Sequence, residues 1–86
     1  MDEKQKAHCR SRLKTLPQGY DREAVMVKLK DKTNREVASF FDDLHHFNIL
    51  LSFRDATVSL MKTSKEKADE YTGHPERKLK ELIEKL

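Results

Sequence analysis

Residues 20–72 contain neither glycine nor proline, and this uninterrupted run constrains the fold more than any other feature of the sequence. Glycine and proline are the residues that most often end helices and form turns, so a run of this length favours long helices. The breaks that the chain does have lie near its ends, at 17–19 and 73–75. We therefore expect an all-α protein, an elongated helical hairpin with short flanking helices, in a single domain over residues 1–86.

Local signals divide the chain into expected helices. Asp21 is suited to cap a helix after the first break, and Thr33 and Glu36 form a capping box before the longest apolar periodic run. Pro75 is suited to the first turn of a last helix. In an extended chain Val25, Val27 and Leu29 would point one way and Met26, Lys28 and Lys30 the other, so a β-strand within residues 22–31 is the alternative. The expected helices are 2–15, 22–31, 34–71 with a kink near 49–53 left open, and 75–86.

The long central segment is apolar on two sides of its expected helix, which is typical of a buried central element. The first stripe comprises Val37, Phe40, Phe41, Leu44, Phe47 and Leu51, continued by Val58 and Met61. The second stripe comprises Ile49, Phe53, Ala56 and Leu60.

The balance of apolar and charged residues favours self-association. Hydrophobic residues make up 36% of the chain and charged residues 38%, so a single copy has a thin core. Each large apolar side chain left in water forgoes about 1.5–3 kcal/mol, and short flanking helices do not cover two faces of a long one. We expect a homodimeric four-helix bundle. The expected dimer or partner interface consists of Phe40, Phe41, Leu44, Phe47, Leu51, Phe53, Val58 and Met61.

Cysteine content and hydropathy suggest a cytoplasmic, intracellular protein. Cys9 is the only cysteine, so no disulfide forms within the chain, as is usual in a reducing compartment. No apolar run approaches the roughly 18 residues of a membrane span, and the N-terminal segment lacks the apolar core of a signal peptide. We expect no membrane association.

Two polar clusters are candidate sites of chemistry. Asp-Asp at 42–43 and His-His at 45–46 lie on the long helix, but adjacent helical residues point about 100° apart. At most two of the four side chains then converge, whereas a metal site needs three or four ligands. His8 and Cys9 are sequence neighbours, which rarely meet as base and nucleophile. We therefore expect no enzymatic activity, no metal and no cofactor.

Charge favours binding to a polyanion. The chain has 18 Lys+Arg against 15 Asp+Glu and a net charge of +3, with basic residues in helical rows suited to phosphate contacts. Tryptophan is absent and aromatic residues are few, so the backbone of a duplex is favoured over stacking on single strands. The expected nucleic-acid-binding residues are Lys6, Arg10, Lys14, Arg35, Arg54, Lys62 and Lys65.

A set of short motifs resembles a known family. Leu-Pro at 16–17, Asp-Asp-Leu-His at 42–45, Thr-Val-Ser-Leu-Met at 57–61, Tyr-Thr-Gly at 71–73 and Glu-Leu-Ile-Glu-Lys-Leu at 81–86 occur in the order seen in that family. Together they resemble the small double-stranded-RNA-binding suppressors of RNA silencing from insect nodaviruses. The resemblance implies a homodimeric four-helix bundle with a short helix across each end. It also implies contacts with phosphates and 2′-hydroxyls along one face of an A-form duplex, regardless of sequence.

Two positions depart from that family's pattern. The family shows an arginine in the third of these motifs, where this chain has Leu60. Gly19 interrupts a segment that the family keeps as continuous helix. One hypothesis is that a neighbouring Arg54, Lys62 or Lys65 supplies the missing charge.

Two other classes of function remain open. A helical protein-interaction module or inhibitor would use the surplus apolar surface to bind a foreign helix, through Phe40, Phe41, Phe47 and Phe53. A ribbon-helix-helix DNA-binding dimer would use residues 25–30 as the strand that enters the groove. The second helix of such a dimer would need apolar residues where Lys62 and Lys65 stand.

Overall fold

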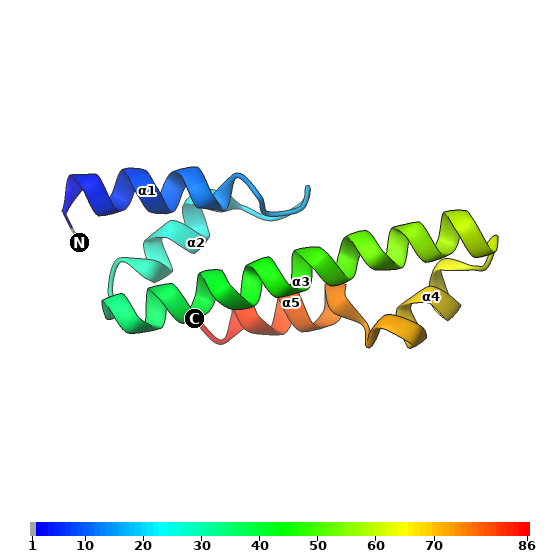
Figure 1. Cartoon of the computed structure of the whole chain (residues 1–86). Helices are drawn as coiled ribbons and strands as arrows, with labels where there is room; N and C mark the ends of the chain where they lie inside the picture. The colour runs from blue at the N-terminus through cyan, green and yellow to red at the C-terminus, as the bar shows by residue number, and fades with distance from the viewer. Residues whose placement is uncertain (1) are drawn as a thin grey trace.

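The protein is an elongated assembly of helices (Figure 1). The computed structural model describes residues 2–86, and its principal dimensions are 47 × 21 × 20 Å. No strand occurs in these residues, so the all-α prediction is confirmed. The five helices are α1 (Glu3–Leu13), α2 (Arg22–Leu29), α3 (Asn34–Met61), α4 (Lys65–Thr72) and α5 (Pro75–Glu84).

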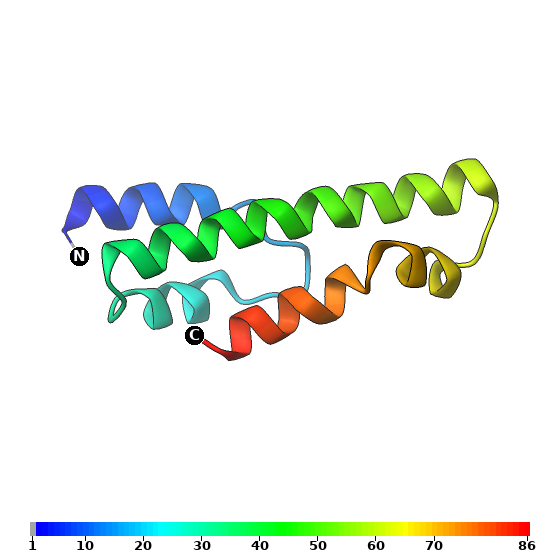
Figure 2. The ribbon, with the colours of Figure 1, turned by 60° about the horizontal axis from the view of Figure 1, so that its bottom comes forward.

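The 28-residue α3 is the element against which the others pack. Figures 1 and 2 show α1 alongside the N-terminal half of α3, α5 returning along its middle, and α4 near its C-terminal end. Backbone contacts join α3 to α4 and α5, and α1 to α2. The N-terminal half of α3 packs its apolar side chains against α1, α2 and α5, whereas α4 lies along only one side of the C-terminal end.

Side-chain caps set the starts of α2 and α3. The Asp21 carboxylate accepts hydrogen bonds from the backbone N–H groups of Glu23 and Ala24, at 3.0 and 3.2 Å. At α3, the Thr33 hydroxyl accepts from the Glu36 N–H at 3.2 Å, and the Glu36 carboxylate accepts from the Thr33 N–H at 3.3 Å. That backbone hydrogen bond and a second one from the Thr33 hydroxyl lower the pKa of Glu36.

Residues 22–29 are helical, which contradicts the alternative of a strand in this segment. The ribbon-helix-helix hypothesis required that strand to enter a DNA groove. An isolated strand would leave its backbone N–H and C=O groups unpaired, whereas the helix satisfies them internally. Val25, Met26 and Leu29 of α2 instead fill the core.

The expectation of one helix over 34–71 is wrong, because α3 ends at Met61 and α4 begins at Lys65. Lys62 adopts a left-handed conformation with φ 48°, and the Ser64 hydroxyl accepts a hydrogen bond from the Lys67 N–H at 3.2 Å. Serine competes in this way with the helical backbone and favours a new N-terminus. The turn folds α4 back onto α3. No interruption occurs near 49–53.

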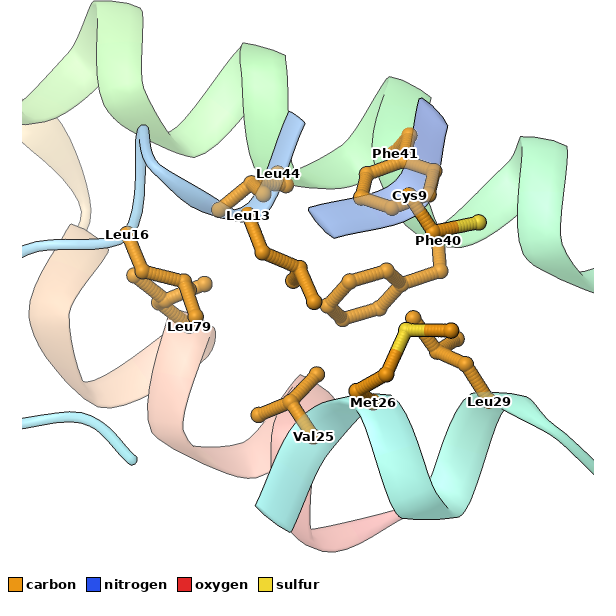
Figure 3. Close-up of a cluster of buried hydrophobic side chains, with 10 residues drawn as sticks. All are labelled: Cys9, Leu13, Leu16, Val25, Met26, Leu29, Phe40, Phe41, Leu44 and Leu79. Carbon is orange, nitrogen blue, oxygen red and sulfur yellow. The ribbon is translucent and has the colours of Figure 1, made fainter. Parts of the chain in front are cut away.

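The core lies between α1, α2, α5 and the N-terminal half of α3 (Figure 3). Phe40 points toward Val25 and Met26 of α2, whereas Phe41 lies beside Cys9 of α1. The buried residues of this core are Cys9, Leu13, Leu16, Val25, Met26, Leu29, Phe40, Phe41, Leu44 and Leu79.

Three residues expected at an intermolecular interface are core residues of the monomer. Phe40, Phe41 and Leu44 are each 2% exposed. Short helices do cover two faces of α3 here, because α2 and α5 lie together below α3 in the view of Figure 2, whereas α1 lies behind its N-terminal half. Phe47 and Leu51 are partly buried against the same core. On α3, exposed large apolar side chains therefore lie only farther along the helix.

We expect Leu29→Ala to lower the free energy of unfolding by about 2–5 kcal/mol, because Leu29 is fully buried and its truncation leaves a cavity. Val27→Ala in the same helix is the control. Val27 is 59% exposed, so its truncation should change stability by less than about 0.5 kcal/mol. Urea unfolding followed by circular dichroism measures both. Equal effects would contradict the placement of α2.

Candidate functional site

The exposed large apolar side chains of α3 gather on its C-terminal half. Ile49, Phe53 and Leu60 are 53%, 66% and 83% exposed, and Ala56 between them is also exposed. Their spacing of four, three and four residues places them on one side of the helix. These are the residues of the second stripe found in the sequence. We call Ile49, Phe53, Ala56 and Leu60 the apolar stripe.

The apolar stripe begins where α1 stops covering α3. Asn48 donates a hydrogen bond to the carbonyl of Thr15 at 3.2 Å, which ties the end of the α1 segment to α3 one residue before Ile49. Beyond this point an open hollow of about 880 Å³ lies beside the apolar stripe. Ile49, Phe53 and Ala56 line it, together with residues 15 and 17 after α1.

The residues expected at a dimer interface divide into exposed and covered groups. Phe53 and Met61 are 66% and 65% exposed, whereas Val58 is half-buried on the side of α3 that faces α4. Of the expected set, only Phe53 belongs to the apolar stripe. Ile49 and Leu60 were recognised as part of the second stripe but were not included in the expected interface.

Arg54 is the one buried charged side chain within residues 2–86, at 5% exposed. Its guanidinium donates to Asp69 at 3.1 Å and to Asp55 at 3.0 and 3.1 Å, and it forms an ion pair with Glu76 at 3.1 Å. Burial opposes the charged form, but the hydrogen bonds to Asp69, Asp55 and Glu76 outweigh it and raise the pKa of Arg54. We call these four residues the Arg54 cluster.

The Arg54 cluster joins α3 to α4 and to the first turn of α5. Arg54 was expected to bind nucleic acid, but its donors are taken up by carboxylates within the chain. The sequence signal was misleading because Asp69 and Glu76 reach Arg54 only after the turn at 62–64. We therefore leave Arg54 out of the candidate nucleic-acid interface.

The other basic residues expected to bind nucleic acid lie at two separate places on the monomer. Lys6 and Arg10 are on α1, with Lys14 just after it, whereas Lys62 and Lys65 lie at the far end of α3 (Figure 1). Arg35 lies in the first turn of α3 and is exposed.

Ion pairs engage part of this set. Lys6 pairs with Glu3 at 3.2 Å, Arg10 with Glu23 at 3.8 Å, and Lys65 with Glu76 at 3.5 Å. Surface pairs contribute only about 0–1 kcal/mol, so a phosphate competes readily for these cations. Lys14, Arg35 and Lys62 are exposed and form no ion pair within the described chain.

Neither a metal centre nor a spanning helix is found in the part of the chain that the structure describes. No three His, Cys, Asp or Glu side chains of residues 2–86 are grouped to hold a metal ion. No helix among these residues has the length and apolarity to cross a bilayer. Comparisons with protein-family models, curated proteins and solved structures found no match. Function is therefore inferred from the surfaces of this chain.

We expect Arg54→Met to lower the free energy of unfolding by about 1–3 kcal/mol, because it leaves Asp69 and Glu76 together without their cation. Lys62→Met, at an exposed position, is the control and should cost less than about 0.5 kcal/mol. Hydrogen exchange should quicken at the amides of α4 and remain unchanged in α2. Unchanged exchange in α4 would show that the Arg54 cluster does not hold this helix.

Proposed function

We propose that this protein is a non-enzymatic homodimer that binds double-stranded RNA without regard to sequence. The apolar stripe is the observation on which the proposal rests. It presents Ile49, Phe53 and Leu60 to solvent on a rigid helix. Burying each of them stabilises an assembly by up to about 1.5–3 kcal/mol, which favours an interface at this surface.

The spacing of the apolar stripe fits an antiparallel pairing of two copies. With a two-fold axis midway between residues 54 and 55, Ile49 faces Leu60 of the partner subunit, and Phe53 faces Ala56 of the partner subunit. A large ring then meets a small methyl group at the centre, which lets the two helices approach closely. An isologous interface of this kind closes after two copies.

Charge along α3 favours the antiparallel orientation. On the face that carries the apolar stripe, the preceding turns bear Asp42 and His46. Lys62 lies past the other end of the stripe, in the left-handed turn after α3. The antiparallel arrangement brings Lys62 of the partner subunit toward Asp42, whereas a parallel one places like charges together. The hollow beside the apolar stripe leaves room for the end of the partner's α3.

The same dimer gathers the scattered basic residues. Thr15 is hydrogen-bonded to Asn48, so Lys14 lies near this level of α3. The two-fold axis places Lys62 of the partner subunit beside residue 47, close to Lys14. Two composite basic patches result, about 20 Å apart at 1.5 Å per residue. Separated patches on a rigid rod suit contacts with the phosphates of a duplex.

Two features of the sequence favour an RNA duplex as the ligand. Tryptophan is absent, which disfavours stacking on single-stranded bases. The motifs at 16–17, 42–45 and 57–61 resemble those of double-stranded-RNA-binding silencing suppressors, and this favours RNA over DNA.

The dimer is tested with Phe53→Glu. We expect this variant to keep its helical circular dichroism and to sediment at half the mass of the wild type, because a charge at the centre of the interface remains hydrated in the monomer. Tyr71→Glu is the matched control, since Tyr71 is 72% exposed on α4, outside the apolar stripe. A monomeric wild type, or a Phe53→Glu variant that stays dimeric, would refute the arrangement. A monomeric wild type would favour the docking of a foreign helix instead.

RNA binding is tested by mobility shift with an RNA duplex, a DNA duplex and single-stranded RNA at two salt concentrations. We expect Lys14→Glu with Lys62→Glu to weaken duplex-RNA binding at least about tenfold and to reduce its salt dependence, because phosphate contacts release counterions. Lys78→Glu with Lys80→Glu on α5 changes net charge equally and should have a smaller effect. Equal losses in the two double variants would contradict the composite patches, and no shift by the wild type would refute RNA binding.

A further inference from the structure

A groove between α1 and the N-terminal half of α3 forms a second surface, separate from the apolar stripe. Its volume is about 580 Å³, within the range of ligand-binding clefts. It stays open in the antiparallel dimer, because the two copies of α3 overlap only beyond residue 48. We call it the α1–α3 groove; its walls include Lys4, His8, Arg12, Val37, Ala38 and Phe41.

The α1 wall is a basic row. Lys4, His8 and Arg12 follow one another at four-residue spacing and so extend about 12 Å along one side of the helix. None of the three forms an ion pair within residues 2–86. Asp2 also lines one end of the groove, and its carboxylate caps α1 by accepting a hydrogen bond from the Gln5 N–H at 2.7 Å.

The α3 wall and the floor are uncharged. Val37, Ala38 and Phe41 form the wall, and Cys9 lies below it at 3% exposed. Burial raises the pKa of the Cys9 thiol, although the charge of Arg12 opposes this, so the sulfur stays protonated. The α1–α3 groove therefore has one basic side and one apolar side.

Two side-chain contacts join the walls of the α1–α3 groove. The Arg12 guanidinium lies over the Phe41 ring, 4.7 Å from its centroid. At one end the Gln5 side chain donates to Asn34 at 3.5 Å, which is the limit for a hydrogen bond.

We propose that the α1–α3 groove binds an acidic amphipathic helix of a partner protein. Charge complementarity selects the occupant: carboxylates at four-residue spacing pair with Lys4 and Arg12, and neighbouring apolar side chains pack on Val37 and Ala38. A wall about 12 Å long matches about two helical turns. A carboxylate also offers Arg12 a bidentate partner in place of the Phe41 ring. This binding goes beyond the proposed RNA function. The phosphates of a nucleic acid would contact only the basic side of the groove, whereas an amphipathic helix contacts both sides.

The probe is a labelled synthetic helix with glutamate at every fourth position and leucine on the adjoining face, and binding to the full chain is followed by fluorescence anisotropy. We expect Lys4→Glu with Arg12→Glu to weaken binding at least tenfold, and a peptide with lysine in place of glutamate to restore it. Lys78→Glu with Lys80→Glu is the charge-matched control and should bind like the wild type.

Ala38→Asp tests the apolar side at an exposed position, without altering the basic row or the contact between Arg12 and Phe41. It should weaken the peptide at least tenfold and leave duplex-RNA binding unchanged. The proposal is overturned if a glutamine peptide binds as tightly as the glutamate peptide. It is also overturned if the wild type does not bind the glutamate peptide, or if Ala38→Asp has no effect on it. Phe53→Glu should retain peptide binding, because Phe53 lies outside the α1–α3 groove. Peptide binding and dimer formation are therefore tested independently of each other.

Discussion

The 28-residue α3 is much longer than the helices that pack on it, and the surfaces of the molecule follow from this difference in length. At 1.5 Å per residue α3 extends about 42 Å, whereas the 11 residues of α1 cover little more than a third of it. Where α1, α2 and α5 surround α3, apolar residues on two of its faces form the core. Beyond Asn48 only one side is covered, and the apolar side chains on the other side remain in water.

The Arg54 cluster keeps this uneven coverage in place. A buried guanidinium is tolerated only with close carboxylate partners, and Asp69 and Glu76 supply them from α4 and α5. Their pairing holds α4 against the side of α3 that faces away from the apolar stripe. It also removes Arg54 from the set of cations that can meet a phosphate, so the basic surface depends on exposed lysines at the ends of α1 and α3.

Local features of the sequence were sufficient to predict most of the helices. Asp21, and Thr33 with Glu36, start helices through hydrogen bonds within a few residues, so their effect is visible in the sequence. The break at 62–64 was missed because it involves no glycine or proline. It depends on the Ser64 hydroxyl and on a left-handed Lys62, and the contacts of α4 with α3 then favour the turn over continued helix.

By itself the sequence determined the helical class, the two apolar stripes of the long helix and the rows of basic residues, because each depends on spacing along one chain segment. The tertiary structure decided which stripe is exposed and which cation is buried. Phe40 and Phe53 have the same side chain on the same helix, yet one is core and the other is surface. The two rings lie about 140° apart around α3. Phe40 lies on the side that packs against α1, α2 and α5, whereas Phe53 lies on the side that these helices leave uncovered. Contacts between segments distant in sequence set which side is covered.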